Sequence, residues 1–409
     1  MTATPDEPRA TGAAIGIVLV NLGTPEEPRP QAVRRFLRQF LSDRRVIEVP
    51  PALWRICLEV CILPFRPRVA ATKYASVWYP DGSPIMVHSR DQASALAAAL
   101  TQPEPSDDDG GRVGGAGAVG AGAPGGAGAP GGATPGGAAP APTPGAAPAP
   151  TPGAASLPDT TPPAREASHA ANYTVRYAMR YGSPSISAVF DELAGQGVGR
   201  VLVIPAYPQY SQTTVATIYD AVAAHLRTRR DQPELRFVRS FPTDPRYIEA
   251  LAQRIQETWQ VEGSPDFDGG DTLLLSFHGI PAAMAASGDP YPTECAATAA
   301  ALRARLGLTP QQCPMTFQSK FGTAAWLTPA TIDTVRALAA SGTRRVDVVC
   351  PGFVSDCLET LEEIGILNRE TFAIAGGGRF VRVPCLNTHG AWIDTLANLV
   401  RTHTQGWVV

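Results

Sequence analysis

The sequence of 409 residues lacks an apolar run of the length that crosses a bilayer. Its first residues also lack the pattern of a secretory signal. Asp6 and Glu7 precede the first apolar run, and no small-residue cleavage site follows that run. These absences predict a soluble protein that resides in the cytoplasm.

Paired cysteines are absent as well. The seven cysteines are scattered without a C-x-x-C spacing, at positions 57, 61, 295, 313, 350, 357 and 385. This arrangement argues against a disulfide framework or a zinc site and suits a reducing compartment. The chain also has no excess of basic residues, since its net charge is −3, so nucleic acid is not the expected partner.

Charged and large apolar residues are nearly missing from residues 101–170. This segment is mostly Gly, Ala and Pro, and no charged residue occurs between Arg112 and Asp159. It offers too little apolar surface to offset the entropy of ordering, so we predict a disordered insertion. Its formal G-x-G-x-x-G at 115–120 has no strand before it and no helix after it, which argues against a nucleotide site. Residues 1–14 are predicted to be a flexible N-terminus.

Short apolar, β-branched runs alternate with helical patterns on both sides of the insertion. They predict strands at 15–21, 173–181, 200–204, 235–241, 273–277, 314–318, 346–350 and 380–384. The second four repeat the first in residues as well, since RVLVI (200–204) matches RVDVV (345–349). We therefore predict an α/β fold of two Rossmann-like domains, each with a four-stranded parallel sheet flanked by helices. The first takes 15–100 and 171–260, and the second takes 261–409.

A histidine and a glutamate follow two strands of the second half. His278 ends the run 273–277, and Glu359 lies in the helix expected after 346–349. Because the carboxyl ends of parallel strands face one crevice, both side chains are expected there. A capping box, in which Asp356 and Glu359 satisfy backbone N–H groups, is the structural alternative.

The internal repeat bears on this choice. In the aligned first half, Leu22 takes the place of His278 and Thr214 takes the place of Glu359. A helix cap is served by Ser or Thr as well as by Asp or Glu. The scaffold is thus repeated whereas the imidazole and the carboxylate are not, which favours a chemical role for the pair.

Two further segments of the first half attract notice. Residues 50–69 hold several large apolar side chains between prolines, which fits either a short core helix or a lip that lies on a flat apolar ligand or a membrane surface. Just before them, Arg44 and Arg45 form either a solvated pair or a receiver of carboxylates.

Eight segments together resemble ferrochelatase, the family that inserts ferrous iron into protoporphyrin IX to form protohaem. They cover nearly the whole chain outside the insertion, in a form similar to that of Gram-negative bacteria. The segments are VLVNLGTP (18–25), FLSDRRVIEVP (40–50), YASVWYPDGSPI (74–85), MRYGSPSI (179–186), YPQYS (207–211), SFHGIP (276–281), TFQSKFG (316–322) and CPGFVSDCLETLEEI (350–364).

The resemblance implies a chelatase-like fold with a porphyrin cleft between the two domains. It places the catalytic and metal-binding residues on His278 and Glu359. Carboxylates on one helix face can conduct protons or metal, which assigns such a path to Glu362 and Glu363. The segments that line the porphyrin pocket of the family contain Arg44, Arg45, Tyr74 and Ser83.

The same resemblance implies the ligands. Protoporphyrin IX and ferrous iron would be substrates, residues 50–69 would cover the macrocycle, and the apolar lip would allow a peripheral contact with the inner membrane. No tightly bound cofactor is expected. The carboxyl-terminal cysteine cluster of some relatives is absent, so no iron–sulfur cluster is expected either.

Two other functions remain open. One is a chelatase of the same fold that acts on coproporphyrin or inserts cobalt. The other is a two-lobed binding protein that carries haem or another solute without reaction. The apolar segment 50–69 favours protoporphyrin, and the missing signal disfavours a periplasmic binder.

Overall fold

The computed structural model describes residues 14–101, 172–320 and 322–407. The predicted flexible N-terminus, 1–14, and the predicted disordered insertion, 101–170, lie outside these residues except for Ala14 and Thr101. The assignment of disorder to the two segments therefore stays a prediction.

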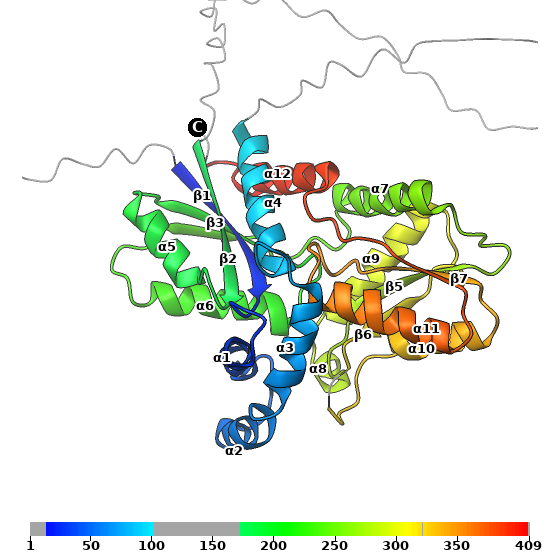
Figure 1. Ribbon diagram of the computed structural model, residues 1–409. Helices are drawn as coiled ribbons and strands as arrows, with labels where there is room; N and C mark the ends of the chain where they lie inside the picture. The colour runs from blue at the N-terminus through cyan, green and yellow to red at the C-terminus, as the bar shows by residue number, and fades with distance from the viewer. Residues whose placement is uncertain (1–13, 102–171, 321, 408–409) are drawn as a thin grey trace, which may run out of the picture. The chain divides into compact units, whose positions relative to one another are not determined.

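Two four-stranded parallel sheets make up the centre of the described chain (Figure 1), which confirms the predicted fold class. The first has the order β2-β1-β3-β4 and the second the order β6-β5-β7-β8. Their bounds are β1 Ala14–Gly23, β2 Asn172–Tyr181, β3 Arg200–Pro205, β4 Glu234–Phe237, β5 Thr272–His278, β6 Met315–Gln318, β7 Arg345–Val349 and β8 Arg379–Arg382. The two orders are equivalent position by position, so the internal repeat found in the sequence is a repeat of topology.

The central strands read as unbroken apolar runs because helices cover both faces of each sheet. All five residues of β7 are buried, and so are eight of the ten residues of β1. The edge strand β4 ends at Phe237, four residues before the predicted end at 241. Its residues are only half-buried or exposed, so the pattern of burial there is weaker than in the central strands.

The helices follow the predicted plan. The helical spacing of Val33, Phe36, Leu37 and Phe40 predicts a helix over 30–41, and α1 has this span, with the first three of these residues buried. The α-helices are α1 Pro30–Leu41, α2 Pro51–Cys57, α3 Arg66–Val77, α4 Pro84–Thr101, α5 Ile186–Gly195, α6 Thr217–Leu226, α7 Pro245–Glu262, α8 Ala282–Ala286, α9 Tyr291–Leu306, α10 Thr331–Ala340, α11 Arg369–Ile374 and α12 Gly390–His403.

Three segments among the described residues are π-helices, a rare form with wider turns that often occurs at functional sites. They are η1 Leu58–Ile62, η3 Gln212–Ala216 and η4 Glu359–Asn368. Segment η3 follows β3, and η4 follows the equivalent strand β7. The sequence pattern predicts an ordinary helix at the place of η4.

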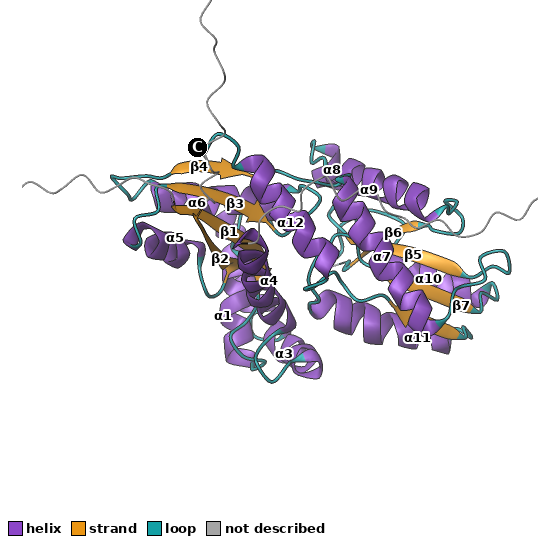
Figure 2. Cartoon of the chain, turned by 90° about the horizontal axis from the view of Figure 1, so that it is seen from above, coloured by secondary structure: helices purple, strands orange, loops and turns teal. Residues whose placement is uncertain are grey.

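One hydrophobic core joins the two halves. It extends from β1 and α4 through α7 to β5 and α12 without interruption. The C-terminal helix α12 packs against both α4 and α7 and lies between them (Figure 2). None of the helices in 14–101, 172–320 and 322–407 has the length and apolar character needed to cross a bilayer.

Gly23, the last residue of β1, has a backbone conformation that requires glycine. Its φ is +105°, and a Cβ there would lie 1.7 Å from the carbonyl oxygen of its β2 partner Tyr181. We expect Gly23→Ala to lower the free energy of unfolding by about 1–3 kcal/mol or more, measured by urea denaturation. Gly199→Ala, where a Cβ meets nothing within 4 Å, is the control and should change it by less than about 1 kcal/mol.

Candidate functional site

His278 is the last residue of β5 and is half-buried. Its Nδ1 lies 2.6 Å from the carbonyl oxygen of Gly279. A carbonyl oxygen only accepts, so Nδ1 donates, and a neutral ring then has a free lone pair on Nε2. The ring also lies 6.3 Å, between centroids, from that of Phe353. The residue is thus held in a form that can accept a proton or bind a metal.

Glu363 lies in η4 and faces the end of β6. The N–H of Ser319 donates to its Oε1 at 2.7 Å, and the Ser319 hydroxyl donates to its Oε2 at 2.6 Å. The pKa of Glu363 is raised, mainly because the carboxyl group is buried. The hydrogen bonds from Ser319 and the charge of His278 lower this pKa, whereas the charge of Glu359 raises it further. His278 and Glu359 therefore each lie within electrostatic reach of Glu363.

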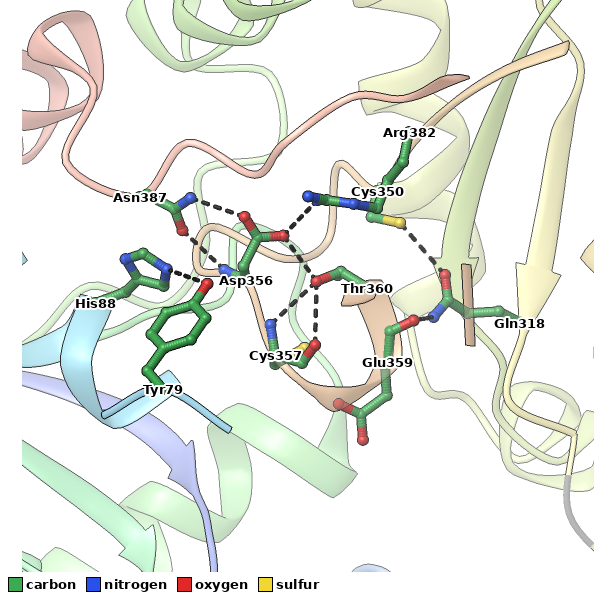
Figure 3. A network of polar contacts seen from close by, with 10 residues as sticks. All are labelled: Tyr79, His88, Gln318, Cys350, Asp356, Cys357, Glu359, Thr360, Arg382 and Asn387. Carbon is green, nitrogen blue, oxygen red and sulfur yellow. Dashed lines mark hydrogen bonds and ion pairs between the residues drawn. The ribbon is translucent and has the colours of Figure 1, made fainter. Parts of the chain in front are cut away.

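The capping-box alternative for Glu359 is wrong. The backbone N–H of Asp356, which a capping box would bond to Glu359, donates instead to Oδ1 of Asn387 at 2.8 Å. The π-helix η4 begins at Glu359 itself, without a side-chain cap. In Figure 3 the carboxylate of Glu359 points away from the polar network around Asp356. The Glu359 side chain therefore does not cap the N-terminus of the helix.

Asp356 is the centre of that network. Its carboxylate is 4% exposed and accepts hydrogen bonds from Thr360 at 2.9 Å, Arg382 at 2.8 Å and Asn387 at 2.8 Å (Figure 3). Burial raises the pKa of Asp356, but Arg382, Asn387 and Thr360 more than offset it, so the pKa lies below its ordinary value. The charged carboxylate thereby fixes the chain where it enters η4.

Gln318, at the end of β6, holds η4 from the other side. Its Nε2 donates to the backbone carbonyl of Glu359 at 3.2 Å (Figure 3). Its Oε1 accepts from the Ser276 hydroxyl at 2.7 Å. Ser276 belongs to β5, two residues before His278. The position of Glu359 is therefore tied to the strand that carries the histidine.

Two tyrosines of the first half face this site. Burial raises the pKa of Tyr74, in α3, and the charges of Glu359 and Cys357 add to it. Burial likewise raises the pKa of Tyr207, just after β3, and Glu359 contributes there too. The Glu359 side chain thus lies near both phenols, and the site is built from both halves of the chain.

Lys73, next to Tyr74, makes an ion pair with Glu362. Its Nζ lies 2.8 Å from Oε1 and 2.9 Å from Oε2 of that residue. Glu362 belongs to η4, 289 positions further along the chain. The predicted path residues therefore have different surroundings, because Glu362 binds an ammonium group whereas Glu363 binds Ser319. Their roles as a path stay predictions.

The predicted substrate-binding residues are placed unequally. Arg44 is exposed, and no hydrogen bond or ion pair of its side chain is found with the described residues. Arg45 is paired with Asp220 of α6. Ser83 is buried, and its hydroxyl accepts from the N–H of Met86 at 3.4 Å in the first turn of α4. Arg44 is thus the most accessible of the three, and their roles toward a substrate stay predictions.

Residues 50–69 form an exposed apolar surface, which we call the lip. Five of its apolar side chains are more than half exposed: Leu53 63%, Ile56 64%, Val60 64%, Phe65 71% and Val69 63%. No residue of α2 is buried, so the alternative of a short core helix is wrong for this helix. Trp54 anchors the lip by donating to the carbonyl of Leu41 at 2.6 Å.

The sequence did not single out several polar groups at this site. The Tyr207 hydroxyl and Nε of Arg180 are buried without a hydrogen-bond partner among the described residues. Arg180 is the penultimate residue of β2, and its charge acts on the pKa of Tyr207. Both residues lie at the carboxyl ends of strands of the first half, and this position is the sequence signal that could have found them. Within the same described ranges, no cluster of three or more His, Cys, Asp or Glu is arranged to hold a metal.

Comparisons with known proteins agree with this fold. The family model for ferrochelatase matches residues 14–107 and 163–404. SirB from Bacillus subtilis with Fe³⁺ is similar over 56% of this chain and 82% of that chain, at 11% identity and a TM-score of 0.42. The sirohydrochlorin chelatase SirB from Bacillus subtilis subspecies spizizenii, in complex with cobalt, covers 56% and 79%, at 12% identity and a TM-score of 0.38.

A third solved structure is DR2241 from Deinococcus radiodurans, a multi-domain protein with structural similarity to chelatases. The match covers 56% of this chain and 45% of that chain, at 13% identity and a TM-score of 0.35. The three structures are too distant to support an argument about this site. The family match spans most of the chain and is sufficient by itself to assign the family.

The two parallel sheets, together with the family match, define the class of protein as a metal chelatase that acts on porphyrins. The chain belongs to the ferrochelatase family, as the resemblance of its motifs implied.

The buried Asp356 carboxylate supplies a test of how η4 is held. Asp356→Asn leaves Arg382 without its counter-charge, so we expect the free energy of unfolding at neutral pH to fall by about 2–4 kcal/mol. Because the folded pKa lies below the ordinary 3.8, the stabilisation is present above that pH and is lost as the pH falls through the folded value.

The measurement is urea denaturation of both proteins at neutral and at acidic pH. The difference between the two proteins should shrink on the acid side. Asp333→Asn is the control, because Asp333 pairs with Arg336 on the surface at 67% exposure. A loss for Asp356→Asn no larger than that of the control would show that the network does not hold η4.

Proposed function

We propose that this protein is a protoporphyrin ferrochelatase, a lyase-class enzyme that inserts ferrous iron into protoporphyrin IX to form protohaem. The observation that carries the proposal is the convergence of His278, Glu359 and Glu363 at the carboxyl ends of β5, β6 and β7 in a chain of the ferrochelatase family. Family membership supports a chelatase, and the residues around the site support the choice of substrate.

Metal insertion requires that a free-base porphyrin lose two pyrrole protons and accept Fe²⁺. The lone pair on Nε2 of His278 can take a proton or bind the metal. The buried Glu363, whose pKa is raised, can receive and release a proton more easily than an exposed carboxylate. In this proposal Glu359 shares the metal with His278, and Glu363 takes the proton onward.

The macrocycle is proposed to lie between the two halves, under the lip. Flat aromatic ligands are held mostly by apolar burial, and the lip offers five exposed apolar side chains. Tyr74 and Tyr207 face the Glu359 side of this space from the first half. Buried polar atoms without partners, on Tyr207 and Arg180, are groups that a bound ligand could satisfy.

The lip also bears on which porphyrin is used. Protoporphyrin carries vinyl groups where coproporphyrin carries propionates, so it presents an apolar edge. Burying a propionate against exposed Leu53, Ile56 and Phe65 would cost the desolvation of an unpaired charge. Protoporphyrin therefore fits this surface better. The location in the cytoplasm and a peripheral contact of the lip with the inner membrane are further proposals.

The experiment is anaerobic incubation of the purified protein with porphyrin and Fe²⁺, followed by visible absorbance. Protohaem should form from protoporphyrin much faster than without protein. Faster metallation of coproporphyrin, or reaction with Co²⁺ and not with Fe²⁺, would replace the proposal by another chelatase. Binding of haem without turnover would favour a carrier. Iron and sulfide analysis of the protein tests our further proposal that it holds no iron–sulfur cluster.

His278→Ala should abolish metal insertion and leave porphyrin binding largely intact, because the ring is held mostly by apolar burial. Initial rates report the first effect and fluorescence titration with protoporphyrin reports the second. Turnover near that of the wild type would remove His278 from the mechanism. Equal loss of binding would assign it to the pocket instead.

Arg44→Gln and Arg45→Gln separate the two arginines predicted to bind propionates. Arg44 is exposed without a carboxylate partner among the described residues, whereas Arg45 is already paired with Asp220. We expect Arg44→Gln to weaken protoporphyrin binding by about tenfold, the effect of losing one charged hydrogen bond, and Arg45→Gln to weaken it less.

The control for this prediction is the porphyrin dimethyl ester, which lacks the charges that Arg44 would meet. Its binding should be the same in Arg44→Gln as in the wild type. Equal losses for the free acid and the ester would point to a structural role for Arg44.

A further inference from the structure

Lysine is nearly absent from this chain. The 34 Lys and Arg residues include only two lysines, Lys73 and Lys320. Arginine therefore serves almost everywhere that a positive charge is needed. Lys73 stands next to Tyr74 in α3, and its partner Glu362 stands between Glu359 and Glu363 in η4. One of the two lysines is thus placed directly at the proposed site.

The geometry of the contact between Lys73 and Glu362 can be made by an ammonium group more easily than by a guanidinium group. Both carboxylate oxygens lie within 2.9 Å of the single nitrogen Nζ. An ammonium is a compact point charge that can meet two oxygens at once, whereas a guanidinium is a planar fork that needs more room. The Glu362 side chain is 14% exposed and that of Lys73 is 42% exposed, so the carboxylate is the buried partner.

We propose that Lys73 is a positioning residue: its ion pair with Glu362 is a clasp that fixes the π-helix η4 against α3 and so sets the approach of Glu359 to Tyr74. This inference rests on the proposed function. Two observations support it. The charge of Glu359 reaches Tyr74, the neighbour of Lys73 in α3. In addition, Glu362 is adjacent to Glu363, which accepts two hydrogen bonds from Ser319 after β6.

The clasp also compensates charge. Segment η4 carries Glu359, Glu362 and Glu363 within five residues, and like charges at this spacing repel one another. The ammonium group of Lys73 neutralises the middle carboxylate. Without it, η4 would hold three neighbouring carboxylates beside the buried end of β6. Lys73 therefore acts on the geometry of the site through Glu362 and does not touch the reacting atoms.

A half-exposed ion pair contributes little to global stability. A positioning role therefore predicts a kinetic defect without a matching loss of stability. The experiment is a double-mutant cycle of Lys73→Met, Glu362→Gln and the combined variant, with kcat and KM measured for Fe²⁺ and protoporphyrin. Each single variant should lower kcat about fivefold and leave KM for protoporphyrin within about twofold.

The combined variant should lose no more than the single variants, because each single change already opens the clasp. Arg305→Met is the matched control. Arg305 joins α9 to Glu249 of α7 through an ion pair outside the site, and its side chain is 41% exposed, close to the 42% of Lys73. The Arg305→Met variant should leave kcat unchanged and alter the melting temperature as much as Lys73→Met does.

Amide hydrogen exchange supplies a readout that does not depend on the substrate. Peptides covering residues 359–368 should exchange faster in Lys73→Met than in the wild type and in Arg305→Met. Unchanged kcat and unchanged exchange would overturn the clasp, as would losses that add in the combined variant. A wild-type protein that metallates no porphyrin would overturn the proposed function, while the exchange data would still decide whether the clasp exists.

Discussion

The buried carboxylate of Asp356 is the constraint on which the site depends. A charge removed from water is stable only when it is paired and fully hydrogen-bonded, and Arg382, Asn387 and Thr360 meet this need. Its partners come from β8, from the segment before α12 and from η4 itself. The start of η4 is therefore fixed to two other parts of the second half, and Glu359 points away from them (Figure 3).

Two residues with a strained backbone hold η4 and the chain that enters it. Among the described residues, Ser319 and Asn387 are the two non-glycine residues with positive φ, at 67° and 46°. The first donates two hydrogen bonds to Glu363, and the second accepts the Asp356 N–H and donates to its carboxylate. Conformations of this kind cost about 1–3 kcal/mol each and persist only where the surroundings impose them. Both residues therefore adopt an unfavourable backbone conformation in which their hydrogen bonds fix the positions of the carboxylates.

Local patterns in the sequence were enough to predict the eight strands and α1, because burial on both faces or on one helical face is visible at short range. They also placed His278 and Glu359 at neighbouring strand ends. The partners of charged residues were beyond reach, since Lys73 meets Glu362 and Arg45 meets Asp220 over separations of 289 and 175 residues. Such pairs depend on how helices pack. The π-helical form of η4 was also missed, because a wider turn leaves no mark on the pattern of polar and apolar residues.

The duplicated scaffold separates what is general from what is specialised. Both halves place a π-helix after the equivalent strand, η3 after β3 and η4 after β7, so the π-helical turn belongs to the scaffold. In η3 the cap is Ser211, whose hydroxyl accepts from Thr213 and donates to Asp289 of the other half. That turn therefore holds the halves together. In η4 the corresponding network is centred on Asp356, Glu359 points away from it, and Glu363 lies within electrostatic reach of His278. The difference between the two copies lies in side chains, and the proposed chemistry follows from those side chains and not from the π-helix alone.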